Sequence, residues 1–537
     1  MKTKILLIFL LAVSFEELSA QQPFIKLFDG DSAYTFEYSI LQNVDSSYIV
    51  VGSTNCYGAG DFDIYMIKLN PDGDTLWTKT YGTINYEYAE SMAKDTNGAG
   101  GYVITGSIYD SIAGTNIACL VNIDNYGNLN WVKTYLKKLS FGIYVQQTMD
   151  GGFLISGQAV IDSTYDYSAL IIKTDNEGNP QWQKTLGSGF TGLDAYGYCS
   201  AQDSLGNYYI TGYVQSPVTG VDVLVIKLSP EGNIIWSKTY AAINRGETGR
   251  FIYPTDDGNF LVLGDITPCG SSDAVSGFYL LKITPSGDTL WTKTYHSYSH
   301  PISYNIMKSN DGGYILGCWA YLQSVSRAIL IKIDSAGTLL WSKYYINDDI
   351  NPNGTIGLQS VLSSFDGGFI FCGSYSSSIS KCYGLVIKTD SLGNTGCYQN
   401  NQTNSIIYTP IIISDKVLPV TNFYMKSSVS LITGSGGKPE SLCSIANLPE
   451  LQRINYNCEV FPNPSSDKII ITNSGKSKIE IINVNGQIIK TFYNNEKEMT
   501  IDLSGLSNGI YIVKVINDKA MPAGSYRVPT NISIFVV

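Results

Sequence analysis

From Phe24 to Thr395 the chain alternates short apolar segments with polar turns rich in Gly, Asp and Asn. The clearest turn is Asp-Gly-Gly followed by an aromatic residue, and it begins at Asp150, Asp311 and Asp366. Each of these turns leads into an apolar segment that ends in Gly. Short apolar segments between such turns are typical of strands joined as hairpins, so the pattern predicts an all-β protein.

The spacing of Trp and Lys predicts a second hairpin in each repeat. Six Trp recur at intervals of 50 to 55 residues, and each is followed two residues later by Lys. A Lys or Asn stands nine residues before each Trp, so the turn between them has a fixed length. We interpret the Trp as buried packing residues, each worth about 3–5 kcal/mol against Ala. They are Trp77, Trp131, Trp182, Trp236, Trp291 and Trp341.

The apolar segment that ends in Gly occurs seven times, so there are seven repeats. The seventh lacks its Trp segment, because Cys397 stands at the expected Trp position. Near the start of the chain, Phe24, Lys26 and Phe28 match the Trp, Lys and Tyr of the other repeats. We therefore expect residues 24–28 to complete the last repeat and close a ring. The seven Gly are Gly52, Gly106, Gly157, Gly212, Gly264, Gly317 and Gly373.

Seven units of this kind predict a seven-bladed β-propeller of four-stranded blades over residues 24–395. One such sheet cannot bury both faces alone, whereas in a ring each sheet covers its neighbour. An open β-solenoid is the alternative, but it has no need for a displaced N-terminal strand. The region resembles the repeat arrays of secreted bacterial propeller-like proteins. That resemblance implies the fold and leaves the function open, because propellers host many activities.

Residues 1–20 have the order of a secretory signal peptide. Lys2 and Lys4 precede an apolar run from Ile5 to Val13, and the small residues Ser19 and Ala20 follow. The run is too short to span a bilayer, and no later stretch reaches the length of a transmembrane helix. We expect an exported chain without a transmembrane helix; the alternative interpretation of this segment is a buried N-terminal strand.

The C-terminal part departs from the repeat. Residues 396–456 are rich in Asn, Ser, Thr and Ile, and we interpret them as a linker with a few strands. Residues 457–519 then show alternating segments separated by turns such as Asn485-Gly486, which predict a small immunoglobulin-like β-sandwich.

This second domain is similar to the type A sorting domain of the type IX secretion system. The similarity rests on Phe461-Pro462-Asn463-Pro464, on Ile481 to Gly486, and on Leu503 to Tyr511. It implies that the partner of the domain is the type IX machinery, which carries the protein across the outer membrane. In this family the domain is usually removed afterwards, as the cargo is released or fixed to surface lipopolysaccharide.

The tail, residues 520–537, diverges from that family. Such domains normally end with one more short, Lys-rich strand, but here Met521-Pro522-Ala523-Gly524 interrupts the pattern. Either Ile532 to Val537 supplies the last strand, or the tail reflects a shifted reading frame. We expect export to be impaired if no last strand forms.

Ten Cys follow residue 20, and export would permit disulfides among them. Cys372 and Cys382 flank a short Ser-rich turn, and Cys397 and Cys443 bracket the predicted linker. Each pair is a candidate disulfide, and the alternative is a free, buried thiol that packs as a small apolar residue.

Charge and composition narrow the candidate chemistry. Acidic residues outnumber basic ones by 46 to 35, which disfavours a nucleic-acid partner. The chain has two His, and His296 and His300 lie in a variable segment where their spacing does not favour a metal site. Three carboxylate pairs remain, which we interpret as solvated loop charges. They are Glu87 with Glu90, Asp256 with Asp257, and Asp348 with Asp349.

We therefore predict no catalytic, cofactor-binding or metal-binding residues, and expect a monomeric, non-catalytic binding or adhesion protein that is secreted or displayed on the cell surface. Its ligand would be a glycan or a surface protein, bound by the loops at 55–61, 216–221 and 267–276. One alternative is a secreted polysaccharide-degrading hydrolase with carboxylates in the channel of the propeller. Another is a structural component of the envelope.

Overall fold

The computed structural model describes most of the propeller region and parts of the C-terminal region. Residues 22–28 and 34–396 are described apart from short gaps; beyond them the described residues are the strands between 399 and 536 and Asn495 with Glu496. The gaps lie at 137, 161–165, 188–191, 218–219, 242–244, 269–275, 297–298, 323–324, 346–353 and 379–380. The proposed signal peptide and Cys397 lie outside the described residues.

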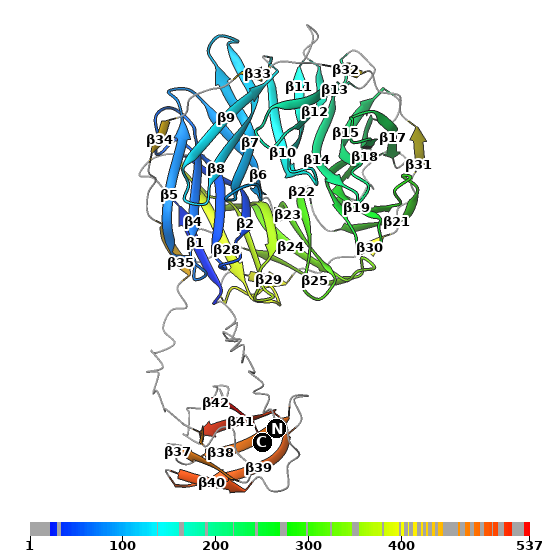
Figure 1. Ribbon diagram of the computed structural model, residues 1–537. Coiled ribbons are helices and arrows are strands. Elements are labelled where there is room, and N and C mark those ends of the chain that lie inside the picture. The colour runs from blue at the N-terminus through cyan, green and yellow to red at the C-terminus, as the bar shows by residue number, and fades with distance from the viewer. Residues whose placement is uncertain are drawn as a thin grey trace, which may run out of the picture. The chain divides into compact units, whose positions relative to one another are not determined.

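Seven antiparallel sheets form a ring, as predicted, and each sheet is one blade of a β-propeller (Figure 1). Blades 1 to 3 are β2 (Thr35–Gln42), β3 (Tyr48–Thr54), β4 (Asp63–Leu69) and β5 (Thr75–Gly82); β6 (Glu87–Asp95), β7 (Gly101–Asp110), β8 (Thr115–Asp124) and β9 (Leu129–Tyr135); and β10 (Ser140–Gln147), β11 (Phe153–Val160), β12 (Tyr167–Thr174) and β13 (Pro180–Leu186).

Blades 4 to 6 repeat this order of four consecutive strands. They are β14 (Ala195–Gln202), β15 (Tyr208–Ser216), β16 (Gly220–Leu228) and β17 (Ile234–Ala241); β18 (Arg245–Pro254), β19 (Phe260–Pro268), β20 (Gly277–Ile283) and β21 (Thr289–His296); and β22 (Ser299–Lys308), β23 (Tyr314–Leu322), β24 (Val325–Ile333) and β25 (Leu339–Tyr345).

Blade 7 closes the ring with a strand from the other end of the propeller region. It consists of β26 (Thr355–Ser363), β27 (Phe369–Ser378), β28 (Lys381–Thr389) and the N-terminal β1 (Phe24–Phe28). β1 pairs antiparallel with β28 along its whole length, from Phe24 opposite Lys388 to Phe28 opposite Gly384. The displaced strand predicted from Phe24, Lys26 and Phe28 is therefore confirmed.

The two ends of the ring differ in their connections. Because strands alternate in direction, both tight turns of a blade lie at one end, which we call the turn face. The connections between the second and third strands, and those between blades, lie at the other end, the loop face. Most of the variation in repeat length falls in these two kinds of connection and so lies on the loop face; the exception is the first turn of blade 2, which is two residues longer than in the other blades.

The Trp-x-Lys-x-Tyr motif of each outer strand contacts the next blade. In blade 4, Trp236 packs on the turn at Gly287, whose backbone φ is 82° and whose missing Cβ would lie 3.0 Å from the indole. The hydroxyl of Tyr240 donates to the carbonyl of Gly287 at 2.7 Å. The ammonium of Lys238 lies 5.7 Å from the centre of the Trp236 ring. Phe24 takes the Trp role for blade 7, against Gly73.

The Tyr of this motif, not the Trp, is the buried residue. Tyr81, Tyr135, Tyr240, Tyr295 and Tyr345 are almost completely buried, whereas the six Trp of the motif are half-buried. The prediction of buried Trp was therefore wrong. The reason is position, because the Trp covers a surface turn of the neighbouring blade while the Tyr, four residues on, reaches between the sheets.

A second contact ties the two hairpins of one blade together. The Lys or Asn nine residues before each Trp, and Lys388 in blade 7, meets an Asp of the first turn. In blade 7 the pair is Lys388 and Asp366, at 2.8 Å, with both side chains buried. The others are Lys68–Asp45, Asn122–Asp95, Lys173–Asp150, Lys227–Asp203, Lys282–Asp257 and Lys332–Asp311.

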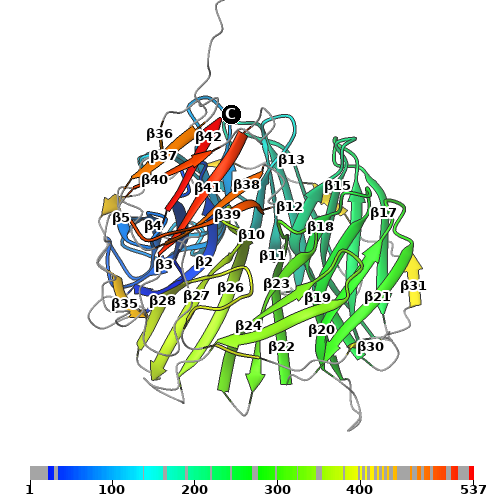
Figure 2. The same cartoon turned by 90° about the horizontal axis from the view of Figure 1, so that it is seen from below.

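The segment predicted as a linker adds a fifth strand to every blade. Its strands are β29 (Gln399–Asn401), β30 (Ile406–Ile407), β31 (Ile412–Asp415), β32 (Val420–Asn422), β33 (Lys426–Ser427), β34 (Ile432–Gly434) and β35 (Pro439–Cys443). They pair in turn with β25, β21, β17, β13, β9, β5 and β1. We call these seven strands the belt, since they visit the blades in reverse order and lie at the outer edge of the ring (Figures 1 and 2).

The Cys372–Cys382 disulfide does not form. Cys372 lies opposite Val386, and Cys382 lies opposite Ser376, so the two thiols are not neighbours across the hairpin. Both are free and buried, as are Cys119, Cys199 and Cys318.

The C-terminal unit is separate from the propeller, with the division between Ile445 and Ala446. It contains two small antiparallel sheets, and the tail supplies the last strand of one of them. The sheets are β36 (Val460–Phe461), β37 (Lys468–Thr472) and β40 (Glu498–Asp502); and β39 (Ile488–Asn494), β38 (Ser477–Asn483), β41 (Ile510–Asn517) and β42 (Asn531–Val536). The described part of the chain holds no helix able to cross a membrane.

Candidate functional site

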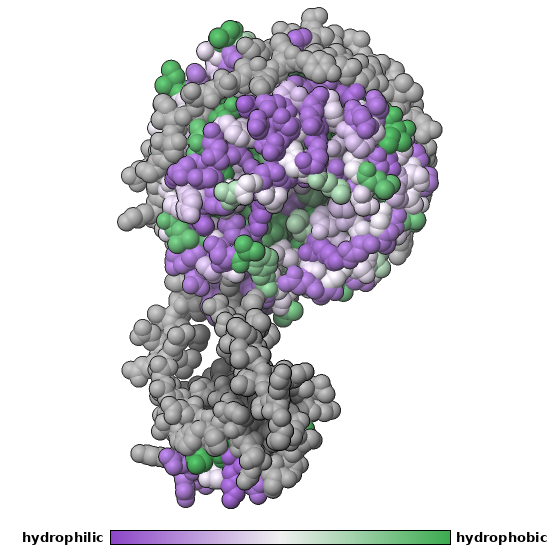
Figure 3. Space-filling view, in the orientation of Figure 1, coloured by the Kyte–Doolittle hydropathy of each residue, from purple (hydrophilic) through white to green (hydrophobic). Residues whose placement is uncertain are grey.

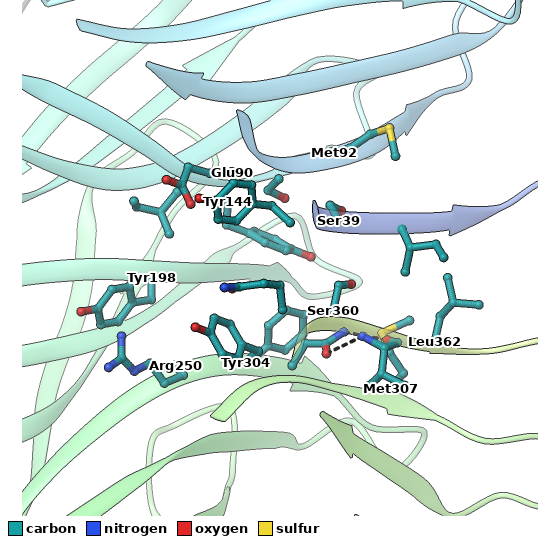
Figure 4. A pocket seen from close by; sticks show the side chains of 18 of the residues that line it. Ser39, Glu90, Met92, Tyr144, Tyr198, Arg250, Tyr304, Met307, Ser360 and Leu362 are labelled. Carbon is teal, nitrogen blue, oxygen red and sulfur yellow. Dashed lines mark hydrogen bonds between the residues drawn. The ribbon is translucent and has the colours of Figure 1, made fainter. Parts of the chain in front are cut away.

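The centre of the ring holds a cavity of about 450 Å³, lined by the innermost strand of every blade. Figure 3 shows the hollow on one face of the propeller, and Figure 4 shows the side chains that surround it. The seven strands are β2, β6, β10, β14, β18, β22 and β26. A site here receives one contribution from each repeat.

Each innermost strand carries a β-bulge at the same position. In β2, Glu37 pairs with Gly52 and Ser39 with Val51, so Tyr38 is the extra residue. A bulge redirects one side chain, and here it directs that side chain into the cavity. The seven bulged residues are Tyr38, Glu90, Ile143, Tyr198, Arg250, Tyr304 and Gln359, and all of them line the cavity.

In six of the seven blades the repeated Gly of the second strand accommodates this bulge; in blade 6, Cys318 lies at that place and Gly317 precedes it. A Cβ at Gly52 would lie 1.8 Å from the carbonyl oxygen of Phe36, and one at Gly212 would lie 1.7 Å from that of Tyr196. No side chain would fit so close to a backbone carbonyl at these two Gly. These Gly were noted in the sequence as the ends of strands, but a Gly inside a strand also indicates a bulge. That signal could have located the cavity residues, which the sequence analysis missed.

Glu90 is the acidic residue of the bulge ring. It is part-exposed to the cavity, yet removal from bulk water raises the pKa of its carboxyl to about 7. Burial, followed by the nearby charge of Glu90, raises the pKa of Tyr38 well above its usual value. Tyr38 is therefore a neutral hydrogen-bonding group, whereas Glu90 titrates near neutral pH.

Arg250 is the basic residue of the ring, and it is held from two sides. Its Nε donates to the carboxylate of Asp265 at 3.0 Å, and its guanidinium lies 4.5 Å from the centre of the Tyr198 ring. Asp265 also accepts hydrogen bonds from the backbone N–H of Ser303 at 2.6 Å and from its hydroxyl at 2.7 Å. Arg250 is thus fixed in place, and its charge is balanced by a buried carboxylate.

The rest of the lining is mostly apolar. Met92, Met307 and Leu362 line the cavity beside the polar groups of the bulge ring (Figure 4), as do Leu41 and Phe251. Such a cavity presents aromatic and aliphatic surfaces with a few fixed polar groups, which is typical of a site for a small ligand or one segment of a larger one.

The interpretation of the carboxylate pairs as solvated loop charges was wrong for Glu87, which is buried. Glu90 lines the cavity, but Glu87 is buried between strands and accepts hydrogen bonds from the backbone N–H and hydroxyl of Thr83, at 2.8 and 2.7 Å. Asp256 and Asp257 pair instead with Lys308 and Lys282. Asp348 and Asp349 lie outside the described residues.

The two His lie at the start and end of strands rather than inside a loop. His296 is the last residue of β21, and His300 belongs to β22. Across the residues whose placement is given, no group of three or more His, Cys, Asp or Glu side chains could hold a metal ion.

The three loops predicted to bind ligand all belong to the loop face. The segment 55–61 joins β3 to β4, and its residues are described. In 216–221, Ser216 pairs with Gly220 at the end of the β15–β16 hairpin. Most of 267–276 lies outside the described residues.

Comparison with protein families identifies the C-terminal unit. Residues 459–523 match the model of the secretion system C-terminal sorting domain. This unit is a type IX secretion sorting domain. The sorting domain indicates export to the cell surface or the extracellular space. Its last sheet strand, β42, lies beyond the matched residues.

No match was found among the curated proteins. Solved structures similar to the chain include PorZ, a surface component of the type IX secretion system of Porphyromonas gingivalis, at 8% identity over 93% of this chain and 81% of that one, with a TM-score of 0.26. Chaetomium thermophilum Sqt1 is similar at 10% identity, 69% and 98% coverage and a TM-score of 0.35. A xylan β-1,4-xylosidase from Bacillus halodurans is similar at 8% identity, 73% and 100% coverage and a TM-score of 0.25.

Proposed function

We propose that this protein is an exported, non-catalytic binding propeller whose ligand enters the central cavity. One observation carries the proposal: the seven bulges share one geometry but present different side chains to one cavity. Residues needed only for the fold repeat from blade to blade, as the outer Trp and Lys do. A position that keeps its geometry while its side chain changes is better explained by recognition than by packing.

The ligand classes follow from location and lining. Export places the cavity outside the cell, where glycans and surface proteins are available. Tyr38, Tyr198 and Tyr304 offer ring faces and hydroxyl groups, Gln359 offers an amide, and Glu90 offers an acceptor. This lining suits a ligand rich in hydroxyl groups, or a protruding polar segment of a protein.

The second candidate function is a polysaccharide hydrolase, and Glu90 is the observation that favours it. A pKa of about 7 suits a general acid. Glycoside hydrolysis normally requires two carboxylates across a cleft. Among the lining residues that the structure gives, Glu90 supplies the one carboxylate, and Asp265 is engaged by Arg250 and Ser303.

The test incubates the full chain with a panel of insoluble polysaccharides and records protein depletion and soluble sugar together. Depletion without released sugar, reduced in Gln359→Ala but not in Tyr126→Ala, supports the proposal. Tyr126 is the matched control because it is 77% exposed on a tight turn of the turn face.

Released sugar that disappears in Glu90→Gln would replace the proposal with the hydrolase. Depletion that is equal in both variants would move the site away from the cavity. If no polysaccharide depletes the protein, cross-linking to intact bacterial surfaces decides between a protein ligand and no ligand. Labelling that is equally strong in the wild type and in Gln359→Ala contradicts the cavity as the site.

A further inference from the structure

Aromatic side chains lead from the loop face to the bulge ring along the innermost strands. Residues two apart on a strand share one side, so the positions four and two residues before a bulge lie in line with it. In blade 1 these positions hold Tyr34 and Phe36 before Tyr38, with ring centres 6.2 and 6.3 Å apart. In blade 2 they hold Tyr86 and Tyr88 before Glu90, with the two rings 6.4 Å apart and nearly parallel.

Phe62 joins these two rows into one surface. It lies in the connection between β3 and β4, and a backbone bridge pairs it with Tyr86. Its ring is 6.4 Å from Phe36 and 5.3 Å from Tyr88. The outermost members, Tyr34 and Tyr86, are 37% and 42% exposed, so the surface opens to solvent on the loop face.

A third row approaches the cavity in blade 4. Tyr196 stands two residues before the bulged Tyr198, and the two rings are stacked at 5.8 Å. Tyr213 stacks on Tyr196 at 4.6 Å, and Tyr167 lies 5.3 Å from Tyr196. Tyr198 in turn meets the guanidinium of Arg250. This row therefore also ends at a polar group of the cavity.

The aromatic residues that precede the bulges on the innermost strands are confined to neighbouring blades. The position two residues before the bulge is aromatic in blades 1 to 4, as Phe36, Tyr88, Phe141 and Tyr196. In blades 5 to 7 the same position holds Thr248, Ile302 and Gly357. Blade 6 carries aromatic residues on its second strand instead, where Trp319 donates its indole N–H to the hydroxyl of Tyr304 and lies 5.6 Å from Tyr321. Along the innermost strands themselves, the aromatic path is therefore confined to blades 1 to 4.

We infer that the ligand is an extended neutral glycan chain, stacked on the aromatic rows of blades 1, 2 and 4 and continuing into the bulge ring. The inference rests on the proposed function and extends the site from the cavity to the loop face. Two members of the rows, Tyr38 and Tyr198, also line the cavity, so the two surfaces are continuous. Flat ring faces bind the C–H faces of sugars, whereas the cavity groups Glu90, Gln359 and Arg250 bind hydroxyl groups.

A neutral chain fits the charges better than an acidic one. Arg250 is already paired with Asp265, and Glu90 adds negative charge when it is ionised. An acidic polysaccharide would therefore meet no net positive charge at the end of its path.

The test measures calorimetric binding of the full chain to cellohexaose, xylohexaose, mannohexaose and chitohexaose, each beside its monosaccharide. We expect at least one hexaose to bind about tenfold or more tightly than its monosaccharide, because it adds ring contacts outside the cavity. In the double variant Tyr34→Ala/Tyr86→Ala this advantage disappears, while monosaccharide affinity is unchanged. Tyr126→Ala, on the turn face, keeps the advantage.

Each of the other outcomes contradicts one part of this inference. If hexaose and monosaccharide bind equally, the aromatic rows are not a binding surface, although the cavity remains the site. If the advantage survives in Tyr34→Ala/Tyr86→Ala, the chain follows another path. If no sugar of either length binds, the glycan inference fails, and the cavity is then judged by the surface-labelling assay.

Discussion

The outer and inner edges of the blades differ in what the seven repeats keep constant. At the outer edge, Trp, Lys and Tyr recur with few changes, and each set contacts the turn of the next blade. At the inner edge the backbone repeats a bulge, but the side chain at that bulge is Tyr, Glu, Ile, Arg or Gln. The outer edge therefore repeats its residue types, whereas the inner edge repeats only its backbone geometry.

This difference separates stability from recognition within one chain. The outer contacts tie neighbouring blades and do the same work seven times, so the same residues suit every blade. The inner positions face one shared space, where seven side chains of five residue types compose one surface. Changes at the outer edge should therefore alter unfolding, and changes at the inner edge should alter binding.

The largest effect is expected from removing the belt. A chain ending at Thr395 should unfold at least about 5 °C below a chain ending at Ile445, because seven outer strands lose their pairing partners. Amide exchange should accelerate most in the outer strands, and in β1 above all, since β1 lies between β28 and β35. Equal melting temperatures would show that the belt contributes no stability.

Breaking the buried ion pair of blade 7 comes next. Asp366→Asn leaves the ammonium of Lys388 buried without its counter-ion, so we expect a loss of about 3–5 kcal/mol in denaturant unfolding at pH 7. The exposed pair Lys308–Asp256 is the control, and Asp256→Asn should cost less than about 1 kcal/mol. Similar losses in the two variants would contradict the role of burial.

The Lys–Asp pairs of the first turns also make the stability of the propeller fall at acid pH. Burial alone would raise the pKa of Asp311, but hydrogen bonds from Ser309 and Lys332 outweigh it and lower the pKa to about 2. The stabilisation is therefore complete above the unfolded value of about 4, and it is lost as pH falls towards 2. Unfolding curves between pH 5 and 2, in the wild type and in Asp311→Asn, should show a smaller loss in the variant.

A matched pair of substitutions tests the two edges directly. Trp236→Ala should cost about 3 kcal/mol, because it uncovers the turn at Gly287. Gln359→Ala, at the inner edge, should change stability by less than about 0.5 kcal/mol and should weaken binding instead. The comparison would fail if both variants lost stability alike.

The smallest effect is expected for Glu90→Gln. Burial raises the pKa of Glu90 to about 7, so the folded state holds this proton more tightly than the unfolded state does. That stabilisation is present below the unfolded value of about 4 and is lost as pH rises through 7. Ligand affinity should change several-fold between pH 6 and 8 in the wild type and stay constant in Glu90→Gln. A pH profile unchanged by the substitution would assign the titration to another group.

Most of the propeller fold could be predicted from the repeat pattern. Phe24, Lys26 and Phe28 match the outer-strand motif, and this match was enough to place β1 in blade 7. The fixed spacing between Lys and Trp also gave the hairpin correctly, because a turn of constant length requires adjacent strands. Local patterns succeed here because each strand repeats its own surroundings.

The belt and the bulges could not be predicted from the repeat pattern. Belt strands such as β30 and β33 contain two residues each and show no alternation, since backbone pairing with a distant blade defines them. The bulged residues differ in type, so no motif marks them, and only the Gly beside them in the register repeats, in six of the seven blades. The half-buried state of the Trp follows from contacts between blades, which a single repeat does not contain.

The belt also sets a limit on how this gene can change. Tandem repeats gain and lose copies by unequal recombination, and an ordinary propeller can absorb such an event by altering its number of blades. Here each copy of the repeat is matched by one short strand encoded much further along the chain, in the opposite order. Losing one repeat would leave a surplus strand and misalign every strand after it. The sequence therefore specifies the number of blades twice, once by the repeats and once by the belt strands, and the two numbers must change together.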